Sequence, residues 1–283
     1  MNLLSKMPRV AEIIWKELES CEPSQLKEGT IMKMVCGSFY LSKESENRSV
    51  LGEDAHFICA EENTIGVADG VGGWALSGVD AGEYARKLME NSAMAVHNQH
   101  RKSGVDPKEV LHEAYANTKN ILGTSTACIV TFNNKDGTLH AVNVGDSGFM
   151  LFRDNKCVYE SPIRQHYFNC PLQLGTGSND GPQSATEIKV KVLRPGDVIV
   201  LGTDGLLDNV SPGEIEKILE ENTIVEPEML AWIIAEQLAF RNSEDVNRST
   251  PFAIAAHEAG VEHIGGKRDD VTVIVGHIIE ASQ

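Results

Sequence analysis

The sequence has little that would tie the chain to a membrane, a nucleic acid or an oxidising compartment. No apolar run approaches the roughly 20 residues of a membrane-spanning helix, and the N-terminal residues lack a signal peptide's hydrophobic region. The six cysteines are scattered without a Cys-x-x-Cys pair, which argues against a zinc site or a disulfide framework. Basic residues number only 25 against 41 acidic ones. Such a surface repels phosphate backbones and anionic lipids, so we expect no nucleic-acid partner and no membrane partner.

The composition is that of a globular protein. Of 283 residues, 41% are hydrophobic and 23% are charged, which excludes a disordered or fibrous chain. Apolar residues at helical spacing predict an amphipathic helix near the N-terminus, followed by a polar linker, within residues 1–30. Residues 31–283 are then expected to form a single domain.

Predicted strands and helices are grouped in blocks along the chain. Alternating or β-branched runs predict strands at residues 31–40, 55–60, 64–68, 126–132, 139–144, 149–153, 187–192, 197–201 and 271–278. Helical periodicity predicts helices at residues 80–97, 107–121, 229–240 and 252–259. Because these blocks do not alternate strictly, the pattern favours an α+β fold over a doubly wound parallel sheet. Residues 161–181 are expected to form a long excursion from the sheet.

Acidic residues stand at the ends of four predicted strands. Glu53 and Asp54 precede one strand and Asp69 ends the next, while Asp204 follows a third and Asp269 precedes the last. Carboxylates at the ends of neighbouring strands can converge at one sheet edge, where an oxygen-rich site suits Mg²⁺ or Mn²⁺. Water held between two such ions loses a proton near neutral pH and can attack a phosphoryl group. The alternative is that these acidic residues are ordinary strand-end and turn residues. That explanation is less favoured for all four sites together than for any one of them.

Six ordered motifs resemble those of the metal-dependent protein serine/threonine phosphatases of the 2C type. They are Gly-Glu-Asp-Ala-His at 52–56, Ala-Asp-Gly-Val-Gly-Gly-Trp at 68–74, Gly-Thr-Ser-Thr-Ala at 123–127, Gly-Asp-Ser-Gly at 145–148, Gly-Thr-Asp-Gly-Leu-Leu-Asp-Asn at 202–209 and Gly-Lys-Arg-Asp-Asp-Val-Thr-Val at 266–273. The Asp-Gly-Val-Gly-Gly-Trp variant is similar to the branch that includes plant chloroplast and mitochondrial members. The resemblance implies a four-layer β-sandwich flanked by helices on both faces.

The same resemblance implies a site for two metal ions. Asp54 and Asp69 match carboxylates that bridge or ligate both metals, and the backbone carbonyl of Gly70 would be a further ligand. Asp204 and Asp269 match the ligands of the second metal.

Four more acidic positions are implied to support this site. Glu53 would act partly through metal-bound water, and Asp146 matches a residue that, with Asp204, supports a weaker third metal in some members. Asp208 matches a residue that hydrogen-bonds metal-bound water, and Asp270 is expected to lie behind the ligands.

Two positions depart from the family pattern. Many members carry, directly after the Asp-Gly, a histidine that protonates the leaving alcohol, but this chain has Val71. Many also place a phosphate-clamping arginine where this chain has Ser49, next to Arg48. Candidates to replace the missing acid are His56, His257 and His263.

The expected activity is hydrolysis of phosphoserine and phosphothreonine in phosphorylated proteins by a metal-activated water, with a monomeric enzyme. Two alternatives stay open: a non-catalytic regulatory binding module of the same fold, which Val71 and Ser49 permit, and a phosphatase of small-molecule phosphoesters. The expected location is the cytoplasm or nucleus, because the N-terminal residues are poor in arginine and rich in glutamate for a transit peptide. The chloroplast or mitochondrion is the alternative.

Overall fold

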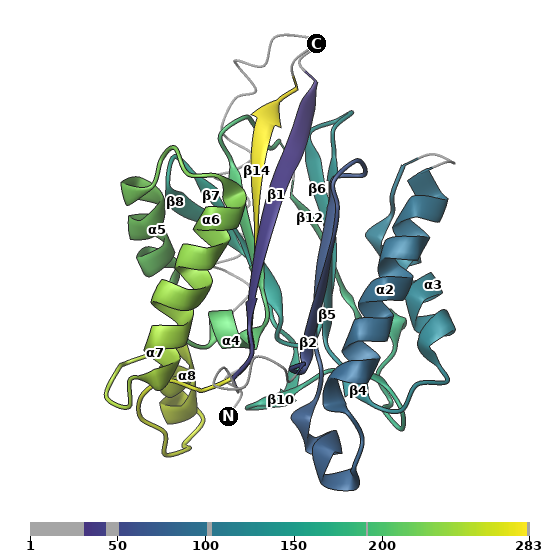
Figure 1. Cartoon of the computed structure of the whole chain (residues 1–283), viewed down its shortest axis with the longest axis vertical. Helices are drawn as coiled ribbons and strands as arrows, with labels where there is room; N and C mark the ends of the chain where they lie inside the picture. The colour runs from purple at the N-terminus through teal and green to yellow at the C-terminus, as the bar shows by residue number, and fades with distance from the viewer. Residues whose placement is uncertain (1–30, 44–50, 101–103, 191, 282–283) are drawn as a thin grey trace, which may run out of the picture.

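Two antiparallel β-sheets lie face to face, and helices cover the outer face of each (Figure 1). The structure, a computed structural model, describes residues 31–43, 51–100, 104–190 and 192–281. The predicted N-terminal helix lies outside these residues, and the single-domain assignment stays a prediction. The four-layer α+β sandwich is confirmed.

Each sheet has five strands. In spatial order, the first sheet contains β1 (Met32–Leu41), β14 (Val271–Glu280), β13 (Val198–Gly202), β7 (Gly148–Arg153) and β8 (Lys156–Glu160). The second contains β12 (Thr186–Val190), β6 (Thr138–Val144), β5 (Ala127–Asn133), β3 (Thr64–Asp69) and β2 (Asp54–Cys59). The hairpin joining β7 to β8 turns through Asp154 and Asn155, whose φ angles of 50° and 62° suit the primed turns of two-residue hairpins.

The central strands of both sheets are buried on both faces, and successive side chains along a strand pack into different layers of the core. In β5, Cys128 and Val130 point between the two sheets, whereas Ala127 and Ile129 pack under the helices of the second sheet. This two-residue alternation explains why the sequence shows continuous apolar runs rather than a clean polar alternation.

The outer helices begin at recognisable caps. The second sheet is covered by α2 (Ala81–His100) and α3 (Pro107–Thr118), and the Asp106 side chain accepts the first-turn N–H of Lys108. The first sheet is covered by α5 (Pro212–Glu221) and a continuous helical run of α6 (Pro227–Trp232), the π-helical η4 (Ile233–Phe240) and α7 (Arg241–Glu244). The helix α8 (Pro251–Glu258) starts after the capping residue Thr250.

Several short elements were not expected from the sequence. The helix α5 was missed, although Ser211 and Glu214 form a capping box at its start. The strand β8 was also missed. The excursion at 161–181 contains the small hairpin of β9 (Gln165–Tyr167) and β10 (Cys170–Pro171) and the strand β11 (Leu174–Gly175), which pairs with β4 (Thr124–Ser125). The remaining elements are η2 (Gly72–Ser77), η3 (Pro182–Ser184) and α4 (Asp204–Leu207).

The described part of the chain contains no helix that is both long and apolar enough to cross a membrane. Its five cysteines are free thiols, and burial raises the pKa of Cys36 to about 12 and that of Cys59 and Cys157 to about 11. Cys36, Cys59 and Cys157 therefore have little thiolate character.

Candidate active site

The predicted aspartates meet at one end of the sandwich, since Asp54 pairs with Asp69 and the charges of Asp54, Asp204 and Asp269 act on Asp69. Asp204 opens α4 and Asp269 precedes β14, and the start of β14 and α4 lie at the lower end in Figure 1. Asp54 opens β2 and is paired in register with Asp69, the last residue of β3. Burial raises the pKa of Asp69, and the charges of Asp204, Asp54, Asp269 and Asp146 raise it further. Of the predicted strand-end carboxylates, Asp54, Asp204 and Asp269 therefore lie near enough to Asp69 for their charges to act on it.

Two glycines allow the chain segments of this site to approach closely. A Cβ atom on Gly70 would lie 2.2 Å from the carbonyl oxygen of Ala81, and one on Gly205 would lie 1.9 Å from that of Asp270. The N–H of Gly70 donates to the carbonyl of Glu53 at 3.0 Å, which ties the end of β3 to the start of β2. This close approach explains why glycine, which has no side chain, follows the aspartate at both positions.

Asp54 is fixed through one of its two oxygens. Its Oδ2 accepts hydrogen bonds from the hydroxyls of Thr203 and Thr272, each at 2.7 Å, while its buried Oδ1 has no hydrogen-bond partner. Burial raises the pKa of Asp54, the charge of Asp270 adds to this effect, and the two hydroxyls oppose it. The carboxylate is oriented by neutral donors and keeps one oxygen available.

Two further aspartates present oxygens of the same kind. Asp146 Oδ2 accepts a hydrogen bond from Gln165 Nε2 at 2.8 Å, but Asp146 Oδ1 and Asp204 Oδ1 are buried without partners. Burial, together with the nearby charge of Asp204, raises the pKa of Asp146 to about 6. Buried carboxylate oxygens without protein donors are unusual, and hard divalent cations prefer such ligands. The residues present therefore fit Mg²⁺ or Mn²⁺.

Two lysine side chains lie among these carboxylates. Lys267 Nζ contacts Asp204, and it lies 2.8 Å from Asp208 Oδ2 and 3.5 Å from Asp269 Oδ2. Burial acts to lower the pKa of Lys267, but the carboxylates outweigh it and the pKa is raised. Burial also raises the pKa of Asp208 to about 7, with the charge of Lys267 opposing.

The second lysine is Lys43. Its Nζ lies 2.6 Å from Glu53 Oε2 and 3.1 Å from Asp269 Oδ1. In this arrangement, no three His, Cys, Asp or Glu side chains of the described residues are gathered as a ready metal-binding group. The two lysine ammonium groups therefore lie among the carboxylate oxygens that would bind a divalent ion.

Asp270 lies behind the cluster, as expected. It is 1% exposed and accepts hydrogen bonds from the backbone N–H groups of Glu53 and Lys43, the latter at 2.7 Å, and from the hydroxyl of Tyr40 at 3.3 Å. A single buried carboxylate thus fixes the backbone on both sides of residues 44–50. Ser49 and Arg48 fall within that range, outside the described residues.

Among the described residues, none of the three candidate histidines hydrogen-bonds to a carboxylate of the cluster. His56 Nε2 lies 3.0 Å from Ser38 Oγ, and burial lowers the pKa of His56. His257 is exposed on α8. His263 packs edge-on against Phe252, with 4.8 Å between ring centroids. Val71, which is half-buried, donates its N–H to the carbonyl of Thr124 at 3.0 Å.

Sequence reasoning did not single out several residues that hold the site together. Thr203, Thr272 and Lys267 stand next to or near predicted ligands within the recognised motifs, so their position was a usable signal. Lys43 and Gln165 carried no such signal, because long-range packing brings them to the cluster.

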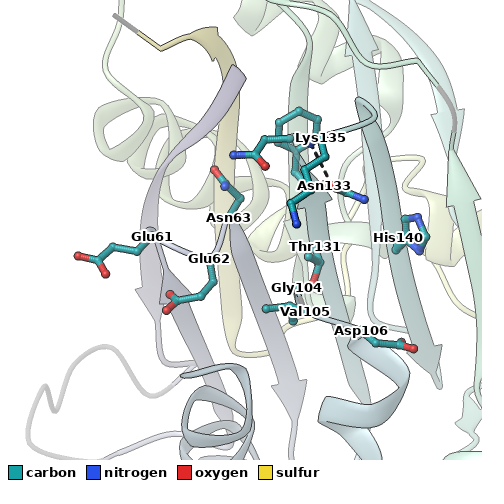
Figure 2. Close-up of a pocket in the computed structure, with 12 residues that line it drawn as sticks. Glu61, Glu62, Asn63, Gly104, Val105, Asp106, Thr131, Asn133, Lys135 and His140 are labelled. Carbon is teal, nitrogen blue, oxygen red and sulfur yellow. Dashed lines mark hydrogen bonds between the residues drawn. The ribbon is translucent and has the colours of Figure 1, made fainter. Parts of the chain in front are cut away.

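Several pockets of the described residues lie outside the carboxylate cluster. The one in Figure 2 has a volume of about 490 Å³ and lies between the β2–β3 and β5–β6 turns, and none of the predicted site residues lines it. A smaller pocket of about 230 Å³ is lined by Trp74, Thr124, His166 and Asp180, among others. Trp74 Nε1 donates to Thr124 Oγ1 at 2.8 Å, so this tryptophan both anchors η2 and forms a pocket wall.

Comparisons with known proteins agree with this geometry. The family model described as stage II sporulation protein E (SpoIIE) matches residues 64–278. Probable protein phosphatase 2C 55 of Arabidopsis thaliana is 45% identical over 254 residues, which are 89% of this chain and 53% of that protein. Protein phosphatase PTC7 homolog fig of Drosophila grimshawi is 36% identical over 286 residues, which are 93% of this chain and 92% of that protein.

A solved structure shares the fold. The photosystem II phosphatase PBCP superimposes with a TM-score of 0.78 at 29% identity, covering 86% of this chain and 98% of that one. The chain belongs to the protein phosphatase 2C family. It spans about half the length of the Arabidopsis relative.

Proposed function

We propose that this chain is a divalent-metal-dependent phosphatase that hydrolyses phosphoserine and phosphothreonine in proteins. The observation that carries the proposal is the set of buried carboxylate oxygens without protein donors on Asp54, Asp146 and Asp204, at the end of the sandwich shared with Asp69 and Asp269. Membership of the protein phosphatase 2C family supports dependence on a divalent metal. The finer assignment is two Mg²⁺ or Mn²⁺ ions, with a weaker third beside Asp146 and Asp204.

The residues proposed to hold the two ions are Asp54, Asp69, Asp204 and Asp269, with the backbone carbonyl of Gly70. When bound, the ions would neutralise phosphoryl oxygens and lower the pKa of a nearby water. The hydroxyls of Thr203 and Thr272 hold Asp54 in one orientation, and Asp270 holds the backbone of Glu53 in place. These contacts fix the charged groups before substrate arrives, which lowers the reorganisation needed during the reaction.

Protein substrates are favoured by the names of the relatives, which are protein phosphatases. The substrate partners are therefore proposed to be phosphorylated proteins, with the chain acting as a monomer. The cytoplasm or nucleus, with the chloroplast or mitochondrion as alternative, stays a prediction about location.

The test is metal-dependent hydrolysis of an aryl phosphate and of a panel of phosphopeptides. We expect EDTA to abolish turnover and millimolar Mn²⁺ or Mg²⁺ to restore it, because oxygen-rich sites hold these ions loosely. Activity that survives exhaustive chelation contradicts the metal-dependent mechanism. Metal binding without hydrolysis of either substrate favours a non-catalytic binding module, and faster turnover of phosphorylated metabolites than of phosphopeptides favours a small-molecule phosphatase.

A further inference from the structure

We propose that Lys43 binds the substrate phosphate, and that divalent ions release it for this role by taking over its two carboxylate partners. The inference rests on the proposed function and adds to it a residue that the motifs do not mark. It makes Lys43 a counter-ion of the carboxylates in the metal-free protein and a substrate-binding residue in the loaded one.

The backbone of Lys43 is held at the rim of the site. Its N–H donates to Asp270 Oδ1 at 2.7 Å, and its carbonyl accepts a hydrogen bond from Arg268 Nη2 at 2.8 Å. Both partners belong to the segment just before β14, which also carries Asp269. The Cα of Lys43 is therefore fixed, whereas its four-carbon stem can rotate without disturbing the fold.

The ammonium group contacts Asp269, which the proposed function assigns to metal binding, and Glu53, which the family resemblance places beside metal-bound water. Lys43 Nζ bridges Glu53 Oε2 and Asp269 Oδ1 at 2.6 Å and 3.1 Å. A divalent ion on these carboxylates both removes the partners of Lys43 and repels its charge. The Lys43 side chain is 33% exposed, so it has room to turn toward the mouth of the site.

The negative charge of the site explains why an ammonium group at its rim would help to bind phosphate. Eight acidic side chains lie in or directly behind the cluster, and when all are ionised, as metal binding favours, their charge exceeds that of two divalent ions and Lys267 together: Glu53, Asp54, Asp69, Asp146, Asp204, Asp208, Asp269 and Asp270. A phosphate dianion approaching from solvent therefore meets a site that is still net negative. A cation at the rim offsets this repulsion, and lysine binds phosphate as a point charge.

Lys267 is less suited to this role. Its ammonium contacts three carboxylates, its side chain is only 17% exposed, and it lies 5.3 Å from the centroid of the Phe252 ring. These contacts hold it deeper among the ligands. Lys43 is thus the lysine of the pair that faces solvent.

The test compares Lys43→Met with the wild type in two calorimetric titrations. Mn²⁺ titrated into the metal-free protein is expected to bind the variant about 3–10-fold more tightly, because a competing cation has been removed. Inorganic phosphate titrated into the Mn²⁺-loaded protein is expected to bind the variant about 10–100-fold more weakly, with a matching rise in KM for an aryl phosphate. The conservative variant Lys43→Arg should keep most of the phosphate affinity. Lys156→Met is the matched control, since its ammonium pairs with Glu216 and Glu220 outside the site, and it should change neither titration.

The opposite signs of the two changes separate this proposal from its rivals. Unchanged phosphate affinity in Lys43→Met, with Mn²⁺ still bound, overturns the proposal and leaves the proposed function intact. A loss of both affinities shows that Lys43 merely holds the site together, and it also overturns the proposal. If the wild type binds no Mn²⁺, the proposed function itself fails.

Discussion

Replacing Asp146 with asparagine should stabilise the metal-free protein. Asp146 is 5% exposed, and its Oδ1 has no hydrogen-bond partner. In Asp146→Asn, the amide oxygen can still accept the hydrogen bond from Gln165, and the amide nitrogen takes the place of the unpartnered oxygen. The substitution therefore removes a buried charge near Asp204 while keeping the volume of the side chain.

The shifted pKa of Asp146 sets the size and sign of the effect. Its rise from 3.8 to about 6 corresponds to about 3 kcal/mol at about 1.36 kcal/mol per pH unit. Because the folded-state pKa is the higher one, the unfolded chain ionises first as the pH rises. The penalty is absent below pH 3.8, grows up to the folded-state pKa and is complete above it. We therefore expect Asp146→Asn to add up to about 3 kcal/mol at pH 8 and about half of that at pH 5.

Urea unfolding in EDTA, followed by tryptophan fluorescence at pH 8 and pH 5, measures this difference. At the upper limit, the gain at pH 8 corresponds to a rise in Tm of about 6–10 °C. The matched control is Asp180→Asn, because Asp180 is buried but accepts hydrogen bonds from His166 Nε2 at 2.9 Å and the Gln173 N–H at 3.1 Å. That variant should lose stability. A loss of stability in Asp146→Asn at pH 8, or an equal gain at both pH values, refutes the reasoning.

Two further variants test the chemistry. Asp69→Asn should remove nearly all turnover, because a neutral amide cannot bridge two cations. The ligand assignment is wrong if Asp69→Asn, Asp204→Asn and Asp269→Asn each keep more than about a tenth of the wild-type rate. That limit corresponds to a loss of transition-state stabilisation below about 1.4 kcal/mol. With Val71 in place of a proton donor, wild-type rates on aryl phosphates should depend steeply on leaving-group pKa, since a general acid contributes about 10²–10⁴-fold for basic leaving groups. Val71→His should flatten that dependence and add a pH limb near an imidazole pKa, and a wild type already insensitive to the leaving group contradicts this expectation.

The sequence allowed the site to be predicted where acidic residues stand at the ends of strands that follow one another in the chain. Asp54 and Asp69 could be placed together because each stands at the end of a strand, and the two strands are neighbours in the chain. The Asp-Gly pairs could be identified because the close approach at Gly70 and Gly205 excludes a side chain. Strands that are buried on both faces have continuous apolar sequences, and these runs allowed the strands of the sheets to be predicted.

Other features depend on contacts that local patterns do not encode. Lys43 reaches Asp269, 226 positions along the chain, because β1 pairs with β14. The helix α5 is a different case, because Ile215, Ile218 and Leu219 recur at helical spacing and the sequence therefore contains a usable signal for it. The hydroxyls of Thr203 and Thr272 converge on Asp54 only once two sheets have packed together.

The carboxylate cluster links the stability of this fold to its ligands. Burial, together with the charges of neighbouring carboxylates, raises the pKa values of Asp54, Asp69 and Asp204, so holding them ionised near neutral pH costs folding free energy. Lys43 and Lys267 offset part of that cost in the metal-free protein. Divalent ions would relieve the rest, and a ligand that binds only the folded state stabilises it by RT ln(1 + [L]/Kd). The same repulsion that weakens the metal-free fold therefore adds to its affinity for metal, and removing it by mutation should exchange activity for stability.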